Sequence, residues 1–324
     1  MPTRSRPTSR RHHTVPQFYL RGFADADQLL TVELPGTRRF KQSVKDASVV
    51  TDMYALHGHE DGDDVIEREL SRVESAAAKV FGRVTSGTWP LPVEDRVTLA
   101  YFMAIQATRT QGQRGLGDSI AAFAVKMQIG AGGKEAFAAQ LRQDDGGISN
   151  EQVSRMWKQA VSAEGPPIAL TDAEWVTQML EMAEKLTGYL LGRPWVLFKF
   201  QRRSLVTSDS PVGLIRDRDS KPWEGVGYAT AWGMSYPLTR KLGLIMSSRA
   251  DVAPDITLEN IQYGLCDQVL VANTETEKLI NDHTIAATSK RLFLHPGDQR
   301  FLPSDLPESR DMKVRVSGGL SFPQ

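Results

Sequence analysis

The feature that most restricts the fold is a long helical stretch enclosed between two β-type regions. Helical spacing of apolar residues dominates from about residue 63 to 192, whereas residues 29–44 and 195–247 contain short apolar runs bounded by turn residues. Strands and helices are therefore grouped instead of alternating, which is typical of α+β domains. We predict a mainly helical block packed on a mostly antiparallel sheet in a single large domain.

Changes in composition along the chain predict three regions. Residues 1–11 contain four arginines among Ser, Thr and Pro and no apolar run, so we expect a disordered basic leader. Residues 12–297 form the α+β domain, with the helical block at about 115–192. Residues 298–324 have the composition of a loop-like tail.

Two local predictions bear on later points. The apolar run at residues 53–57 predicts a short strand, and residues 257–271 have the composition of a helix.

Charge and cysteine content exclude several classes of protein. Lys and Arg number 39, as do Asp and Glu, so no overall field favours a nucleic-acid or membrane partner. The single cysteine, Cys266, cannot form an internal disulfide framework. The sequence contains no apolar run near the ~20 residues of a membrane span and no secretory signal, so we expect a soluble cytoplasmic protein.

A dense segment of unusual side chains begins at His12. Thr14 and Gln17 have the spacing of a capping box, which predicts a helix that starts next to Pro16. His12 and His13 come just before that helix, whose N-terminal N–H groups and positive partial charge suit an anion. Adjacent histidines can also be purely structural and bond nearby backbone.

Two arginines with neighbouring glutamines extend this prediction. Gln17 and Arg21 are four residues apart on one helix, and Gln106 and Arg109 lie on a second helix that is otherwise apolar. A buried arginine must pair with an acid or meet an anion. We therefore predict that Gln17, Arg21, Gln106 and Arg109 bind an anionic or phosphate-bearing ligand.

A candidate reactive carboxylate follows a short apolar strand, in the sequence Ser208-Asp209-Ser210-Pro211. Asp209 with His13 as general base would form a catalytic pair, Ser208 would bind substrate, and His12 could hold a divalent metal as cofactor. The structural alternative for Asp209 is an Asx-type turn.

The helix at residues 63–84 carries two further carboxylates, Glu67 and Glu74. Seven residues of helix place them roughly 10–11 Å apart along the axis, which is too far for a retaining glycosidase pair. We interpret them as a solvated, salt-bridged strip.

Several of these segments together resemble a known family. They are His12–Phe23, the helix with Glu67 and Glu74, Gln106 to Thr110, Phe200 to Val212, Tyr236-Pro237-Leu238-Thr239, and Asn281. The chain resembles the bacterial proteins grouped as domain of unknown function 4238, over about residues 12–295. The resemblance implies one domain with a variable helical middle at about 115–190, and it supplies no reaction.

Two hypotheses for function remain open. The first is a non-catalytic binding or regulatory module whose polar cluster near the first helix binds an anion. The alternative is a phosphodiesterase-like or nuclease-like hydrolase of a phosphate-bearing substrate, with His13 and Asp209 in catalysis.

Overall fold

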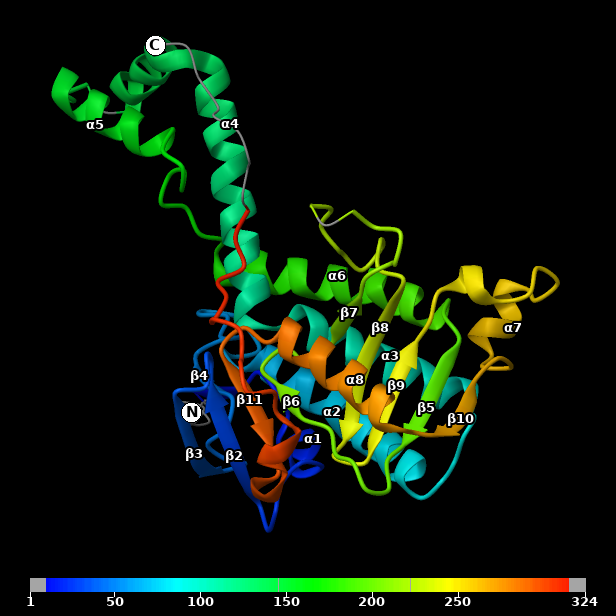
Figure 1. Cartoon of the computed structure of the whole chain (residues 1–324). Coiled ribbons are helices and arrows are strands. Elements are labelled where there is room, and N and C mark those ends of the chain that lie inside the picture. The colour runs from blue at the N-terminus through cyan, green and yellow to red at the C-terminus, as the bar shows by residue number, and fades with distance from the viewer. Residues whose placement is uncertain (1–9, 145, 222, 315–324) are drawn as a thin grey trace, which may run out of the picture. The chain divides into compact units, whose positions relative to one another are not determined.

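The structure is a computed structural model that describes residues 10–144, 146–221 and 223–314 (Figure 1). The described residues form two compact units. The first contains residues up to 110 and residues 176–310, and the second contains residues 111–175 with those from 311 onward. Most of the predicted leader, residues 1–9, and the end of the predicted tail, residues 315–324, lie outside the described part of the chain.

Eleven strands occur in the described part of the chain, all of them in the first unit. They are β1 (Arg11–His13), β2 (Gln28–Glu33), β3 (Arg38–Ser43), β4 (Val49–Thr51), β5 (Trp195–Lys199), β6 (Thr207–Ser208), β7 (Gly213–Ile215), β8 (Gly233–Thr239), β9 (Leu242–Met246), β10 (Gln268–Val271) and β11 (Arg291–Leu294).

Helices are present in both units. In the first unit they are α1 (Gln17–Arg21), α2 (Val65–Thr85), α3 (Val93–Thr108), the part of α6 (Asp172–Leu191) from Val176 onward, α7 (Leu258–Gln262) and α8 (Thr274–Ala287), with 3-10 turns η1 (Arg249–Asp251) and η2 (Pro296–Phe301). The second unit contains α4 (Gln111–Asp144), α5 (Asn150–Ala160) and the start of α6.

The strands form three sheets, ordered β1-β4, β10-β5-β9-β8-β7 and β3-β2-β11-β6. Among the described strands every pairing is antiparallel except that of β10 with β5. Grouped helices and mostly antiparallel strands confirm the predicted α+β class. None of the described helices has the length and apolar character needed to cross a membrane.

Two local predictions were wrong. The strand expected at residues 53–57 is absent, and the adjacent strand β4 ends at Thr51. The helix expected over residues 257–271 is a short helix, α7, followed by strand β10. Pairing with β5 decides the second case, because Val269 to Val271 can follow either periodicity until a neighbouring strand binds them.

Helices cover the five-stranded sheet on both faces. In Figure 1 α8 lies in front of β7 and β8, against which it packs, and α3 lies behind the strands. A Cβ atom on Gly243 of β9 would lie only 2.7 Å from Ile280 of α8, so this glycine permits the close approach of the helix. Behind the sheet, the guanidinium of Arg96 stacks 4.1 Å from the ring of Trp195.

A buried ion pair anchors α3 to the sheet. Both side chains of the Arg96–Asp267 pair are fully buried, with Nε to Oδ2 at 2.8 Å, and Asp267 also accepts from the backbone N–H of Trp195 at 2.9 Å. The carbonyl oxygen of Arg193 accepts a further hydrogen bond from Nη2 of Arg96 at 2.8 Å. These contacts satisfy both buried charges, as a low-dielectric interior requires.

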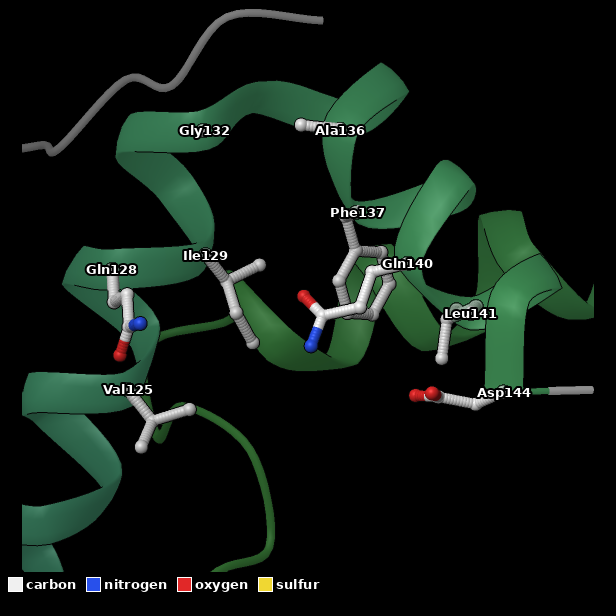
Figure 2. A pocket seen from close by; sticks show the side chains of 9 residues that line it. All are labelled: Val125, Gln128, Ile129, Gly132, Ala136, Phe137, Gln140, Leu141 and Asp144. Carbon is white, nitrogen blue, oxygen red and sulfur yellow. The ribbon is translucent and has the colours of Figure 1, made fainter.

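The second unit is helical and includes a break within α4. Gly133 has a φ of 76°, a left-handed value that glycine adopts without strain, and the chain changes direction there. A pocket of about 350 Å³ lies between the two arms of α4, with Ile129 on one arm and Phe137 and Leu141 on the other (Figure 2). Asp144 is the one charged residue in its lining.

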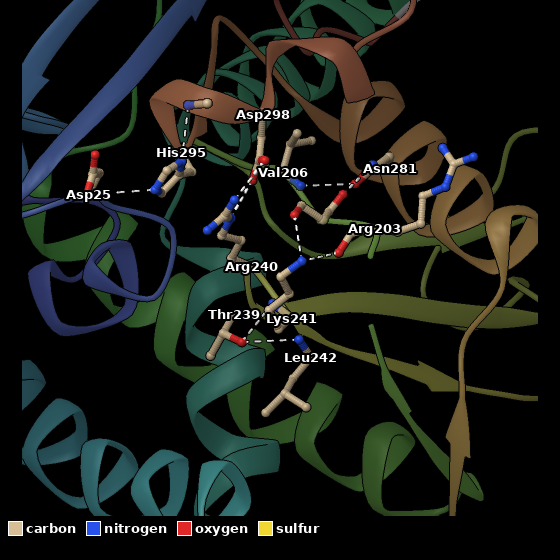
Figure 3. A network of polar contacts seen from close by, with 12 residues as sticks. Asp25, Arg203, Val206, Thr239, Arg240, Lys241, Leu242, Asn281, His295 and Asp298 are labelled. Atoms are coloured by element: carbon tan, nitrogen blue, oxygen red, sulfur yellow. Dashed lines mark hydrogen bonds and ion pairs between the residues drawn. The ribbon is translucent and has the colours of Figure 1, made fainter. Parts of the chain in front are cut away.

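A polar network joins the β8–β9 turn to η2 and to the segment between β5 and β6 (Figure 3). Arg240 in the turn donates to the buried carboxylate of Asp298 in η2, with Nη2 to Oδ1 at 2.9 Å. Lys241 donates to the carbonyl of Arg203 at 2.6 Å and to the hydroxyl of Ser204. The predicted tail therefore begins as an ordered turn held by an ion pair.

Candidate functional site

Strand β1 sends the two histidines in opposite directions. Adjacent residues of a strand face opposite sides, and here His12 is 1% exposed whereas His13 is partly exposed. Nδ1 of His12 accepts from the backbone N–H of Tyr54 at 2.9 Å, and the two rings are stacked. Arg11, which we expected in the disordered leader, is the first residue of this strand.

The expected capping box is not formed. The first helix begins only at Gln17, spans five residues and has Pro16 as its N-cap, which supplies no side-chain bond. Thr14 instead bonds to Ser48, hydroxyl to hydroxyl at 2.5 Å, because β1 continues into an extended segment beside residue 48. So short a helix has little macrodipole to offer an anion.

An open pocket of about 340 Å³ lies between the β1–α1 segment and one side of α2. His13, Gln17 and Phe18 contribute from the first segment. Helix α2 contributes side chains one turn apart along one face, namely Glu67, Ser71, Glu74, Ser75 and Ala78. Both carboxylates that we had interpreted as a solvated strip therefore lie in the wall of a pocket.

Glu74 links the pocket to a buried arginine. Oε1 of Glu74 accepts from Nη1 of Arg109 at 2.8 Å, and the arginine side chain is only 1% exposed. With its amide oxygen turned toward Arg109, Gln106 accepts from Nε at 3.0 Å and from Nη2 at 2.7 Å. Tyr54 donates to the backbone carbonyl of Arg109. The arginine expected to meet an anion is thus paired within the protein.

Burial and neighbouring charge set the protonation of the pocket. Burial, with the negative charge of Glu74, raises the pKa of Glu67 to about 7. Burial lowers the pKa of His13, although the Lys45 carbonyl and Glu74 oppose this effect. The Lys45 carbonyl, 3.1 Å from Nε2 of His13, can only accept, so the proton of the neutral ring is on Nε2 and Nδ1 is its acceptor.

Arg21 lies on the exposed side of α1. Its Nε donates to Asp27 at 3.1 Å and its Nη2 donates to Gln17 at 3.2 Å. Both members of the Arg21–Asp27 pair are about half exposed. Arg21 therefore reaches the pocket only through Gln17, and its charge is already matched by an acid.

Asp209 and Ser208 belong to a different part of the first unit. The carboxylate of Asp209 accepts from three successive backbone N–H groups, those of Ser289, Lys290 and Arg291, at 2.8–3.0 Å. Ser208 is fully buried and its hydroxyl accepts from the N–H of Ser210. Asp209 is absent from the lining of the pocket that contains His13, and its carboxylate instead fixes the start of β11.

A second, more apolar pocket of about 570 Å³ adjoins the first, since Phe18 and Ala78 line both. Its other apolar walls come from the α1–α2 contact and from β8, namely Tyr19, Phe81 and Leu238. The hydroxyl of Tyr19 is satisfied by the carbonyl of Pro237 at 2.6 Å and by Thr207, so this pocket presents mainly carbon surface.

No metal centre is evident in the described part of the chain, where no group of three or more His, Cys, Asp or Glu side chains is placed to hold an ion. Nδ1 of His12 already accepts from the Tyr54 N–H, so this atom does not serve the metal-ligand role predicted for the residue.

Comparison with protein-family models gives a match over residues 11–298, to the family described as Protein of unknown function (DUF4238). The chain belongs to this family. The resemblance found in the sequence is therefore confirmed, and the match runs through both structural units. Neither the curated proteins nor the solved structures contain a match to the chain.

In this DUF4238 chain, sequence reasoning found His13 and Gln17 but missed Glu67 as a pocket residue. The available signal was its position beside Ile66 and Leu70 of the apolar stripe, where a carboxylate is at least partly removed from water. The interpretation of Glu67 as part of a solvated strip relied on its spacing from Glu74. The structure shows that the position of Glu67 in the pocket wall matters more.

Proposed function

We propose that the pocket lined by His13, Gln17, Glu67 and Glu74 is a binding site for a small molecule that is uncharged or positively charged. The observation that carries the proposal is the set of acceptors in one open pocket: two carboxyl groups and an imidazole whose pKa is lowered by burial. Groups of this kind bind hydrogen-bond donors such as amines, amides and hydroxyls.

Charge is the reason for changing the expected ligand from an anion. Arg109 is buried behind Glu74, and Arg21 is paired with Asp27. The side chains that do line the pocket carry no fixed positive charge, and Glu67 becomes negative as its proton leaves near pH 7. An anion would therefore meet like charge, at a cost that low dielectric increases.

The adjoining apolar pocket suggests the rest of the ligand. Because Phe18 and Ala78 line both pockets, a ligand with a donor group in the polar pocket can place a ring or short alkyl chain against Tyr19 and Phe81. Burial of such carbon surface contributes about 25 cal/mol per Å². Benzylamine and benzamide combine a donor with a ring and are suitable probes.

Binding of three probes tests the proposal by ligand-observed NMR: benzylamine, benzamide and inorganic phosphate. We expect the two aromatic probes to bind more tightly than phosphate. Ser71→Trp should fill the pocket and weaken their binding by about tenfold or more, equivalent to at least 1.4 kcal/mol. Ala76→Trp is the matched control, because Ala76 is also exposed on α2 and is absent from the pocket lining.

Phosphate binding that exceeds that of both aromatic probes, and that is lost on Arg21→Ala, would refute the proposal and restore the anion hypothesis. Aromatic probes that bind equally well to Ser71→Trp and to wild type would also refute it, since their site would then lie elsewhere.

A second candidate function, hydrolysis, is favoured by one specific observation. His13 is a neutral base and Glu67 is an acid that titrates near neutral pH, and both line the same pocket. In that reaction Nδ1 of His13 would take a proton from water as the water attacks, and the protonated carboxyl of Glu67 would give a proton to the leaving group. The charge argument favours an uncharged ester or glycoside over the phosphate-bearing substrate expected from the sequence.

Chromogenic substrates distinguish hydrolysis from binding alone. p-Nitrophenyl acetate and p-nitrophenyl glycosides represent uncharged substrates, and bis-p-nitrophenyl phosphate represents phosphodiesters. Turnover that falls in both His13→Ala and Glu67→Gln but persists in Asp209→Asn supports the hydrolase. Equal and negligible turnover in wild type and all three variants leaves the binding site as the function.

A further inference from the structure

Strand β10 ends the five-stranded sheet, because its only strand neighbour in the described part of the chain is β5 (Figure 1). Its four residues are all exposed, and Val269, Leu270 and Val271 are 43%, 45% and 74% exposed. Edge strands leave a row of backbone N–H and C=O groups available for pairing with another strand.

Two other sheet edges of the first unit are protected. Strand β3, the edge of the four-stranded sheet, carries Arg38, Arg39 and Lys41, and β7, at the other end of the five-stranded sheet, spans only three residues. Charged side chains and short length are two common means of preventing edge pairing. Strand β10 is one residue longer than β7 and carries no charged side chain, since residues 268–271 are Gln, Val, Leu and Val.

The backbone of β10 is divided between two sides. Ala272 donates its N–H to the Lys199 carbonyl at 3.0 Å, in line with the parallel pairing of β10 to β5. Because N–H and C=O groups alternate sides along a strand, those of Gln268 and Leu270 also face β5. The N–H and C=O groups of Val269 and Val271 therefore face outward.

We propose that β10 pairs antiparallel with β10 of a second copy of this chain, about a twofold axis that passes through Leu270. In that register Val269 lies opposite Val271 of the second copy, and each such pair exchanges two backbone hydrogen bonds through the outward-facing groups. The two Leu270 residues face each other as the non-hydrogen-bonded pair between them.

The sequence of β10 is suited to this arrangement. Val269-Leu270-Val271 reads the same in both directions, so every apolar side chain meets an apolar side chain of the other copy. No charged residue meets a like charge, and cross-strand aliphatic pairs of this kind contribute roughly 0.2–1 kcal/mol each. The two-fold symmetry also makes the contact self-limiting, since it uses the same edge on both copies.

The start of β10 is held firmly enough to present a fixed edge. Asp267, one residue before the strand, is fully buried in its ion pair with Arg96 and also accepts from the N–H of Trp195. Asn273, just after the strand, caps helix α8 by accepting from the N–H of Thr276 at 2.9 Å. Both ends of the pairing segment are thus fixed to the first unit.

Light scattering after size exclusion, across micromolar concentrations of the full chain, measures the oligomeric state. Charged substitutions at the paired positions 269 and 271 test the proposed register. We expect wild type to be a dimer. Val269→Lys/Val271→Lys places lysine opposite lysine at both outer pairs and should weaken dimerisation by at least about tenfold. Val269→Lys/Val271→Glu places lysine opposite glutamate at both pairs and should restore the dimer.

Val97→Lys, at an exposed apolar position of α3, is the control and should leave the dimer unchanged. Circular dichroism and thermal melting should show that all variants fold like wild type. A monomeric wild type at every concentration would overturn the proposal and leave the edge to an extended peptide of another protein. A dimer unaffected by the double lysine variant, or a Lys/Glu variant as monomeric as the Lys/Lys variant, would overturn it as well.

Discussion

Replacement of Glu67 by glutamine should remove a large part of the pH dependence of stability. In the folded chain the pKa of Glu67 is raised from 4.5 to about 7. Between these values the folded state holds a proton that the unfolded state has released. The stabilisation from this group is therefore complete below about pH 4.5 and is lost as the pH rises through 7.

The size of the effect follows from the shift. One pKa unit corresponds to about 1.36 kcal/mol, so the full shift corresponds to at most roughly 3–3.5 kcal/mol. Between about pH 5 and pH 8 the free energy of unfolding of wild type should fall by roughly 2 to 3 kcal/mol more than that of Glu67→Gln. The amide keeps the shape of the side chain and does not titrate, so the variant should be the more stable protein at pH 8.

Urea unfolding at intervals across this pH range measures the difference directly. Glu69→Gln is the control, because Glu69 lies on the same helix but is 55% exposed beside Arg72. The Glu69 variant should follow the wild-type pH profile. A constant difference between Glu67→Gln and wild type from pH 5 to pH 8 would refute the reasoning, as would a carboxyl ¹³C titration of Glu67 with an ordinary midpoint.

Three further predictions concern buried charges. Glu74→Gln leaves the guanidinium of Arg109 buried without its acid and should destabilise the fold by about 3–5 kcal/mol in urea unfolding. The double variant Glu74→Gln/Arg109→Met should recover much of that loss, and equal destabilisation in both variants would contradict this prediction. Arg96→Met leaves Asp267 buried and unpaired, and a similar loss of about 3–5 kcal/mol is expected by thermal or urea unfolding, with an unchanged midpoint as the contrary result. Asp209→Asn removes one acceptor oxygen from three backbone N–H groups and should cost about 1–3 kcal/mol while leaving probe binding at the pocket unchanged; weaker probe binding would instead connect Asp209 to the site.

Elements that depend on local periodicity followed from the sequence. The long helix α2, expected at residues 63–84, was predicted close to its observed bounds, because it has a clear apolar repeat. The grouping of these elements also gave the α+β class. Local sequence is sufficient for such features because neighbouring residues decide them.

Elements that depend on distant partners did not follow. Residues 268–271 form a strand because they pair with β5. Thr14 does not cap α1 because its hydroxyl is hydrogen-bonded to that of Ser48. In both cases a contact with residues far away in the sequence outweighed the local preference.

The composition of the candidate site shows the same division. The sequence identified His13 as unusual and Arg109 as a charge that must be paired, since both conclusions need only residue type and local surroundings. Only the tertiary structure placed Glu67 and Glu74 in one pocket with His13. It also showed that the carboxylate of Asp209 accepts hydrogen bonds from the backbone N–H groups of residues 289–291. Which acid meets which base depends on packing between segments more than thirty residues apart, and one sequence alone does not encode that pairing in any local pattern.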